Sequence, residues 1–309
     1  MEVEGHVPVL LDEVLHGLAV RPDGTYVDAT FGRGGHSRMI LGALGPRGRL
    51  LALDQDPDAV RVGRELAQAD SRFAIEQESF GRLRRIVEAQ GLTSGVDGIL
   101  FDLGVSSPQL DTPERGFSFQ HEGPLDMRMD PASGPSAADW LNAAEEREIA
   151  GVLRRLGEEP SAGRIARAIC AQRQHQPILT TTDLAAVVLS VMPRRGPRHP
   201  ATRVFQAIRI FINRELEVLE AGLLQALELL ASGGRLCVIS FHSLEDRIAK
   251  RFLRDHSRVD PALDQLPVVP ESARPRLRLI GGAIHASDAE LARNPRARSA
   301  VLRVAEKLA

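Results

Sequence analysis

The composition of this 309-residue chain is that of a globular protein. Hydrophobic residues make up 43% of it, which excludes a disordered protein, and a net charge of -2 excludes a strongly basic chromatin-type protein. No apolar run approaches the roughly 18 residues of a membrane helix, and the first residues lack the pattern of a secretory signal. The two cysteines, Cys170 and Cys237, are expected to be reduced core thiols, so we expect a cytoplasmic protein.

Positive charge is concentrated in the second part of the chain. Residues 131–309 carry 26 basic and 20 acidic side chains, whereas residues 1–130 carry 13 basic and 21 acidic ones. Two stretches, 184–214 and 293–303, hold several arginines and no acid. Such a run is often only a solvated face, but their recurrence in one half favours a surface that binds a polyanion such as a nucleic acid.

The first hundred residues alternate between strand and helix patterns. Strands are predicted at 25–28, 49–54, 73–76 and 96–103, and helices at 36–44, after Pro57 and at 80–90. This alternation predicts a parallel sheet that is covered by helices on both faces.

The pattern changes after the fourth strand. Residues 104–136 are rich in proline and glycine and are expected to form a long, functional loop. Residues 137–191 show only helical periodicity, and Thr180 with Asp183 is typical of a capping box. One long helix is predicted from Thr202 to Leu230, ended by Gly233 and Gly234, because apolar residues recur every three or four positions.

Strand patterns then return at 235–241 and 300–305, with a helix at 244–253 between them. The simplest organisation is therefore one α/β domain, formed by residues 1–132 and 202–309. A helical domain of residues 133–201 interrupts it, and we expect this insertion to recognise the substrate.

A glycine-rich segment, Asp28-Ala-Thr-Phe-Gly-Arg-Gly-Gly-His-Ser37, directly follows the first strand and opens a helix. Glycines allow a ligand to approach the backbone, and a helix N-terminus offers unpaired N–H groups. Asp54 ends the next strand, where an acid accepts hydrogen bonds from the ribose of an adenosine. Ser37 replaces the third glycine of the dinucleotide fingerprint, so both a dinucleotide and S-adenosylmethionine remain possible ligands, and the latter tolerates the looser pattern.

A second segment, Asp102-Leu-Gly-Val-Ser-Ser-Pro-Gln109, ends the fourth strand, where ligands and reactive groups collect in an open α/β sheet. Its Ser-Pro pair resembles in part the Asp/Asn/Ser-Pro-Pro-aromatic loop of methyltransferases that act on the exocyclic amino groups of bases. The match is partial, because Gln109 stands in place of the second proline.

Over nearly its whole length the sequence resembles the bacterial small-subunit ribosomal RNA (cytosine-N4)-methyltransferase family, known as RsmH or MraW. Besides the two segments above, the resemblance rests on 6–13, 115–119, 124–130, 199–209, 240–247 and 294–299. The sequence departs from the family at Pro160–Gly163, where a bulkier basic and aromatic stretch is expected. This departure leaves open where the adjacent helix of the insertion begins.

The resemblance implies a class I, Rossmann-like methyltransferase sheet with a helical insertion and S-adenosylmethionine as the methyl donor. It implies that the substrate is N4 of a cytidine in the decoding region of 16S ribosomal RNA, within the small ribosomal subunit. Carried over by position, the cofactor-binding residues are Gly34, Gly35, His36, Asp54, Phe80, Asp102 and Gln109.

Cytosine N4 is a poor nucleophile because its lone pair is delocalised into the ring. The enzyme must hold N4 in line with the methyl group and accept hydrogen bonds from it as it loses planarity. We expect Asp102, Ser106 and Ser107, or a backbone carbonyl of the same loop, to be these acceptors. Turn chemistry around Pro108 is the alternative role for the two serines.

His242 lies between Ser240 and Arg247 in a segment that is predicted to turn from a strand into a helix on the substrate side. A metal or a catalytic triad with Ser243 and Asp246 is disfavoured, because neighbouring residues do not face one another and no second spaced histidine or cysteine completes the set. We therefore expect no metal. The candidate contacts to RNA are His242, Arg203, Arg209, Arg247, Arg296 and Arg298. A structural ion pair is an equal alternative for Arg203, Arg209, Arg296 and Arg298.

Two rival functions remain at this stage. A nicotinamide oxidoreductase would use the same sheet, but the broken fingerprint and the Ser-Pro loop argue against it. An RNA-binding assembly factor would have a degenerate pocket, which the presence of Gly34, Gly35, Asp54 and Asp102 disfavours. The oligomeric state cannot be read from the sequence.

Overall fold

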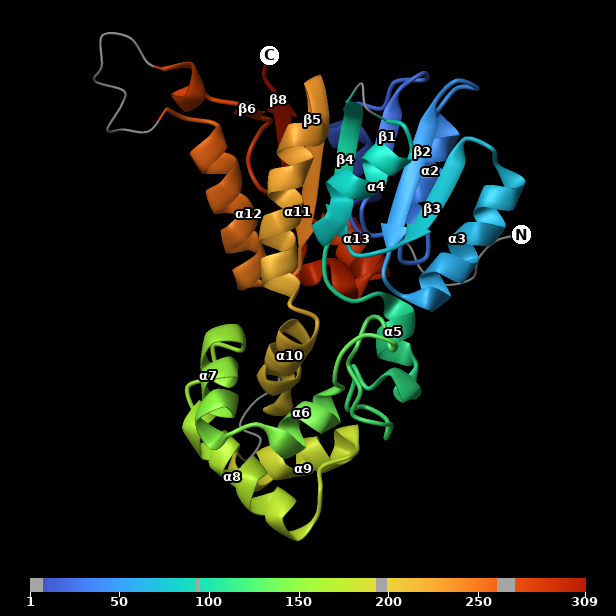
Figure 1. Ribbon diagram of the computed structural model, residues 1–309. Coiled ribbons are helices and arrows are strands. Elements are labelled where there is room, and N and C mark those ends of the chain that lie inside the picture. The colour runs from blue at the N-terminus through green and yellow to red at the C-terminus, as the bar shows by residue number, and fades with distance from the viewer. Residues whose placement is uncertain (1–7, 93–94, 193–198, 260–269) are drawn as a thin grey trace. The chain divides into compact units, whose positions relative to one another are not determined.

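The computed structural model describes residues 8–92, 95–192, 199–259 and 270–309. Its contacts divide the chain into two compact units (Figure 1). The first, here called the α/β unit, comprises Met1–Gly104 and Leu216–Ala309, and the second, the helical unit, comprises Val105–Glu215.

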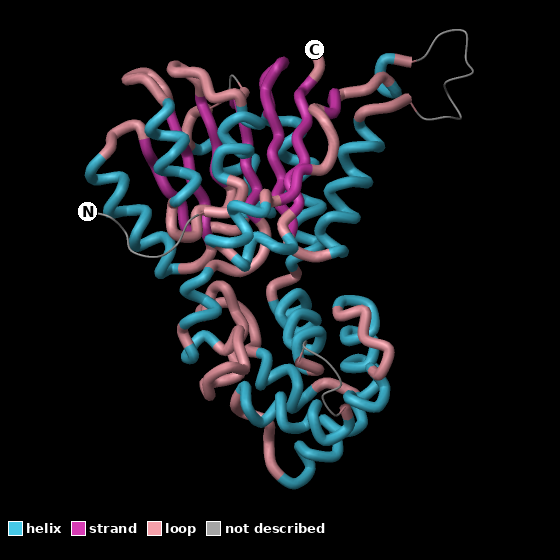
Figure 2. The backbone as a smooth tube through the Cα atoms, turned by 180° about the vertical axis from the view of Figure 1, so that it is seen from behind, coloured by secondary structure: helices cyan, strands magenta, loops and turns pink. Residues whose placement is uncertain are grey.

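One mixed sheet forms the centre of the α/β unit, with the strand order β3-β2-β1-β4-β5-β8-β6 and with β7 paired to β8 (Figures 1 and 2). The strands are β1 (Thr25–Asp28), β2 (Arg49–Asp54), β3 (Phe73–Gln77), β4 (Val96–Asp102), β5 (Leu230–Ser240), β6 (Leu277–Leu279), β7 (Ile284–His285) and β8 (Val301–Lys307). Strands β1 to β5 pair in parallel, whereas β8 runs antiparallel to β5, and β6 and β7 run antiparallel to β8. The Rossmann-like sheet that the sequence predicts is confirmed.

Each face of the sheet carries its own hydrophobic core. In β4, Ile99 and Phe101 join one core, while Leu100 between them joins the other, because successive side chains of a strand point to opposite faces. The first core includes residues of α4 (Leu83–Ala89), α11 (Glu215–Leu229) and α12 (Ser243–His256). The second includes residues of α1 (Leu11–Leu18), α2 (Gly35–Ala43), α3 (Pro57–Ala69) and α13 (Asp288–Arg293). Both faces are therefore covered, as predicted.

The helical unit is built around a single core of buried side chains. Its helices are α5 (Ser107–Asp111), α6 (Ala137–Ala143), α7 (Glu146–Leu156), α8 (Ala162–His175), α9 (Thr181–Val191) and α10 (Ala201–Ile212). The predicted capping box at the start of α9 is confirmed, since the Thr180 hydroxyl and the Asp183 carboxylate each accept a backbone N–H of the other. Within the described parts of the chain, none of the helices is both long and apolar enough to cross a bilayer.

This unit extends beyond the insertion of residues 133–201 that the sequence predicts. Leu125 and Met127, which precede the predicted start, and Ile208, which follows the predicted end, are buried in the same core. The loop predicted over 104–136 is also not structureless, because it contains α5 and the short 3-10 helix η2 (Pro113–Arg115). The backbone N–H of Leu125 donates to the carbonyl of Leu179 over 2.8 Å, which ties this segment to the helices.

The single helix predicted from Thr202 to Leu230 is wrong, because the chain breaks between α10 and α11. The side-chain amide of Asn213 donates to the Met127 carbonyl (2.7 Å) and to the Arg209 carbonyl (2.9 Å), while its oxygen accepts the Met129 N–H (2.8 Å). The next residue, Arg214, adopts a left-handed conformation with φ 49°. The apolar periodicity continues across this break and therefore does not reveal it.

Candidate cofactor site

The glycine-rich turn joins β1 to α2 and requires glycine for its own packing. Gly34, the residue before α2, has φ 72°, and a Cβ atom there would lie 2.5 Å from the Phe31 ring. A Cβ at Gly35 would lie 2.2 Å from Cγ of Pro8. The Phe31 N–H also donates to the Leu53 carbonyl at the end of β2, over 2.9 Å. The two glycines are thus explained by intramolecular contacts, independently of any ligand.

Asp54 connects the end of β2 to the same turn. Its Oδ2 atom accepts the Gly32 N–H (2.7 Å), and its Oδ1 atom accepts the Asp56 N–H (2.9 Å). Burial raises the pKa of Asp54 to about 6, although these two N–H groups oppose the shift. A carboxylate oxygen has more than one acceptor direction, so Asp54 can accept further hydrogen bonds from a ligand hydroxyl.

Asp28 lies fully buried at the end of β1, with only 1% of its surface exposed. The Ser37 hydroxyl donates to its Oδ2 atom over 2.6 Å, and the Thr30 N–H donates to its Oδ1 atom over 3.2 Å. Burial raises the pKa of Asp28, against the effect of the Ser37 hydrogen bond. Ser37 departs from the dinucleotide fingerprint in sequence, and in the structure it satisfies this carboxylate.

Asp102 ends β4 and lies beside His36 of α2. The Nδ1 atom of His36 is 3.4 Å from Oδ2 of Asp102, and its Nε2 atom is 3.0 Å from the Val9 carbonyl. The backbone N–H of Asp102 donates to the Thr30 hydroxyl over 2.7 Å. The other carboxylate oxygen of Asp102, Oδ1, is buried and has no hydrogen-bond partner among the residues that the structure describes. A buried acceptor in this condition is costly unless a ligand satisfies it, so this atom points to a binding site.

Phe80 is half-buried in the 3-10 helix η1 (Phe80–Arg82) that follows β3. Its ring packs edge-on against Phe101, with 5.3 Å between the ring centroids. A Cβ at Gly222 in α11 would lie 2.8 Å from the ring of Phe80. One part of Phe80 therefore belongs to the core, and its contact with a cofactor remains a prediction.

The remaining predicted residues of the loop, Ser106, Ser107 and Gln109, belong to the helical unit. Ser106 and Gln109 form a capping box at the start of α5, in which the Gln109 side chain accepts the Ser106 N–H over 2.9 Å. Ser107 and Gln109 are buried, with 7% and 5% of their surface exposed. The capping box is the turn chemistry that the sequence left open for Ser106.

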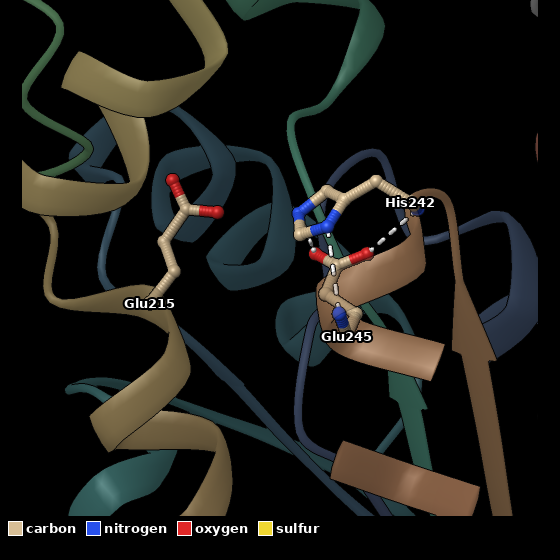
Figure 3. Close-up of side chains that lie close together, drawn as sticks. All are labelled: Glu215, His242 and Glu245. Atoms are coloured by element: carbon tan, nitrogen blue, oxygen red, sulfur yellow. Dashed lines mark hydrogen bonds and ion pairs between the residues drawn. The ribbon is translucent and has the colours of Figure 1, made fainter. Parts of the chain in front are cut away.

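His242 precedes α12 and is held by Glu245 (Figure 3). The Nδ1 atom of His242 accepts the Glu245 N–H, and the Glu245 carboxylate accepts the backbone N–H groups of Phe241 (2.8 Å) and His242 (3.3 Å). Nε2 of His242 lies 3.2 Å from Glu245 but is buried without a hydrogen bond to any part of the chain that the structure describes. The strand-to-helix corner predicted at this segment is present, between β5 and α12.

The five candidate arginines differ in their surroundings. Arg209 forms a two-pronged ion pair with Glu215, with both N–O distances at 2.8 Å. Arg203 is exposed and donates to the Glu158 carbonyl over 3.3 Å, and Arg247, Arg296 and Arg298 are exposed as well. Arg194, Arg195 and Arg198 of the acid-free stretch, and His6 and Val7 of the first matching segment, lie outside the described residues.

Sequence reasoning missed how these residues bind one another. It assigned Asp28 no partner, placed His36 only beside a ligand, and gave Asp54 only a ribose to bind. The structure instead pairs Asp28 with Ser37 and His36 with Asp102. The parallel order of β1 and β4 offered one signal, since it brings the residues at their carboxyl ends to the same edge of the sheet.

Comparison with known proteins decides the family. Residues 3–308 match the MraW methylase family. The chain belongs to this family. It is 58% identical to ribosomal RNA small subunit methyltransferase H of Thiobacillus denitrificans, over 98% of this chain and 97% of that protein. The proteins of the same name from Xanthomonas campestris and Coxiella burnetii are 59% and 54% identical, covering 98% and 99% of this chain and 87% and 100% of their own lengths.

The family that the sequence motifs predicted is therefore confirmed, and with it the class of enzyme, a methyltransferase. Among solved structures, an rRNA methylase from Streptococcus thermophilus aligns with a TM-score of 0.45 and 11% identity, over 99% of this chain and 100% of that one. A likeness of that degree does not bear on the chemistry.

Proposed function

We propose that the protein transfers a methyl group from S-adenosylmethionine to N4 of a cytidine in the decoding region of 16S ribosomal RNA. The observation that carries this proposal is the identity of 54–59%, over nearly the whole chain, to proteins named ribosomal RNA small subunit methyltransferase H. The Asp102–Gln109 loop, with its resemblance to enzymes that modify exocyclic amino groups, supports N4 as the acceptor atom.

The residues at the carboxyl edge of the sheet fit this cofactor. The buried Oδ1 atom of Asp102 has no partner within the described ranges and suits a cationic or N–H-bearing group, and Asp54 retains acceptor capacity for ribose hydroxyls. We assign cofactor binding to Gly34, Gly35, His36, Asp54, Phe80, Asp102 and Gln109. When bound, S-adenosylmethionine supplies a methyl group activated by a positively charged sulfur.

The chain's own residues then have to orient the cytosine amino group and accept its hydrogens. A strong base is not needed before attack, because the N4 proton becomes acidic only as the new N–C bond forms. Asp102 ends β4, and Ser106 and Ser107 follow it by four and five positions. We propose these three residues as the acceptors. N4 lies on the Watson–Crick edge, so the target base must leave any base pair before it reaches them.

Recognition of the RNA is assigned to the inserted helices of residues 133–201 and to basic side chains. Arg203, Arg247, Arg296 and Arg298 are exposed and are proposed to contact phosphates, with His242 on the substrate side. Arg209 would have to exchange its ion pair with Glu215 for a phosphate. Because the proposed substrate is ribosomal RNA, we also propose that the activity is cytoplasmic.

The test is in vitro methylation of small ribosomal subunits isolated from cells that lack this gene product. The purified protein and radiolabelled S-adenosylmethionine are added, the RNA is digested to nucleosides, and the products are separated by liquid chromatography and fragmented by mass spectrometry. We expect N4-methylcytidine, which chromatography against standards distinguishes from the 5-methyl isomer of the same mass.

Two variants sharpen this test. Asp102→Asn is expected to lower methylation strongly, while Arg61→Ala, which changes an exposed arginine of α3, is expected to leave it unchanged. A labelled nucleoside other than N4-methylcytidine would refute the acceptor atom, and no label in any nucleoside would refute the proposed activity.

A further inference from the structure

Both ring nitrogens of His36 face oxygen atoms that can only accept hydrogen bonds. Nε2 is 3.0 Å from the Val9 carbonyl, and Nδ1 is 3.4 Å from a carboxylate oxygen of Asp102. A neutral imidazole carries one proton, so one of its nitrogens would present a lone pair to an oxygen lone pair. The imidazolium form donates on both sides and removes this repulsion. Only 6% of the surface of His36 is exposed, so water has little room to relieve the repulsion in the neutral form.

The charged groups around His36 also favour the imidazolium form. Asp102 at the end of β4 and Asp28 at the end of β1 act on it from the two strands, and the Val9 carbonyl acts from the segment before α1. Burial alone lowers the pKa of His36, but Asp102, Asp28 and the Val9 carbonyl outweigh it, so that the pKa is raised above its ordinary value. The two carboxylates and the carbonyl therefore all favour a protonated His36.

Asp102 has a second oxygen, Oδ1, which is buried and to which none of the described residues donates a hydrogen bond. A positively charged ligand at this oxygen would compete with His36 for the same carboxylate. Because two like charges beside one carboxylate repel each other, the ligand lowers the proton affinity of the imidazole. S-adenosylmethionine carries a net positive charge from its sulfonium and amino groups.

We propose that His36 is the doubly protonated counter-ion of Asp102 in the cofactor-free protein, and that it releases its proton when S-adenosylmethionine binds. This inference rests on the proposed function, since it concerns the same site. It makes His36 a positioning residue, which holds Asp102 through Oδ2 and leaves Oδ1 to the ligand. It also balances charge, because one cation leaves the ion pair as another arrives.

The sign of the pH dependence follows from linkage. If binding releases a proton, affinity for S-adenosylmethionine rises as pH increases through the titration of His36, by at most about tenfold per pH unit for one proton. S-adenosylhomocysteine has the same groups but a neutral sulfur. Its binding is expected to release a smaller fraction of a proton, because it brings one positive charge fewer to the site.

The release is measured by isothermal titration calorimetry in buffers of different ionisation enthalpy at about pH 7, with each ligand. The wild-type protein is compared with His36→Asn, which keeps an N–H donor for Asp102 but cannot become charged. The amino group of the ligand titrates as well, and the variant reports that contribution by itself. We expect proton release with S-adenosylmethionine in the wild type, less with S-adenosylhomocysteine, and loss of the difference in His36→Asn.

Nitrogen-15 NMR of the imidazole in the wild-type protein tests the same inference without a variant. The free protein is expected to show two protonated ring nitrogens, and the complex one protonated and one unprotonated nitrogen. Binding without net proton release, release unchanged in His36→Asn, or a neutral ring in the free protein would overturn the inference and leave the proposed function standing. Absence of any binding would instead overturn the cofactor assignment together with it.

Discussion

The packing of the glycine-rich turn predicts a specific loss of stability in Gly34→Ala. An alanine at φ 72° has to adopt the left-handed conformation, which costs about 1–2 kcal/mol. Its Cβ would lie 2.5 Å from the ring of Phe31, which is buried with 3% exposure. Forcing that ring to move adds about 1–3 kcal/mol of overpacking. The free energy of unfolding of the α/β unit should therefore fall by about 2–5 kcal/mol.

Two other glycines of the same unit separate the contributions, because each variant adds the same methyl group. Gly91 has φ 71° and none of the described residues lies within 4 Å of a Cβ there, so Gly91→Ala should lose only the conformational part, about 1–2 kcal/mol. Gly42 lies in α2 with equally open surroundings, and Gly42→Ala should gain about 0.5–1 kcal/mol. The difference in stability between Gly34→Ala and Gly91→Ala measures the contact with Phe31.

The measurement is urea unfolding followed by far-ultraviolet circular dichroism, combined with hydrogen exchange of the amides in β1 and β2. Hydrogen exchange is needed because the two compact units need not unfold in a single step. If Gly34→Ala lost no more stability than Gly91→Ala, the turn would accommodate the methyl group, and the reasoning from Phe31 would be refuted.

Three further predictions concern the acidic residue of β2, a helix cap and the basic surface. Burial raises the pKa of Asp54 to about 6 from 3.8, so the stability linked to its proton is present at low pH and is lost as pH rises through about 6. The free energy of unfolding in urea should fall as pH rises in the wild type but not in Asp54→Asn. An unchanged pH dependence in the variant would assign the effect to another group. Thr180→Ala removes the side chain that caps α9 and should lower the free energy of unfolding of the helical unit by about 1 kcal/mol, measured by thermal unfolding. Thr180→Ser keeps the hydroxyl and should retain this free energy. Arg298→Ala should weaken binding of ribosomal RNA and reduce its dependence on salt by about one phosphate contact, measured by filter binding at several salt concentrations. Arg61→Ala is its control, and equal effects of both variants would contradict a specific contact.

The sequence by itself determined the elements that local pattern encodes. Strands β1 and β2 have the predicted bounds, Thr25–Asp28 and Arg49–Asp54, because each is a short apolar run between breakers of regular structure. The placement of Asp54 and Asp102 at the carboxyl ends of parallel strands also followed from the pattern, since alternating strands and helices fix the edge to which those ends point. The motifs along the chain were sufficient for the family.

Only the tertiary structure decided where distant segments meet. The helix break after Ile212 depends on Asn213, whose side chain binds the backbone of Met127 and Met129 more than 80 positions earlier. The contact of His36 with Asp102 likewise joins residues that are far apart in the sequence, 66 positions from one another. Periodicity reports which side of an element is buried, but it carries no information about which polar partner a distant segment brings to it. Hydrogen bonds and ion pairs of this kind form only after the core has placed both partners, so they had to be seen in the folded chain.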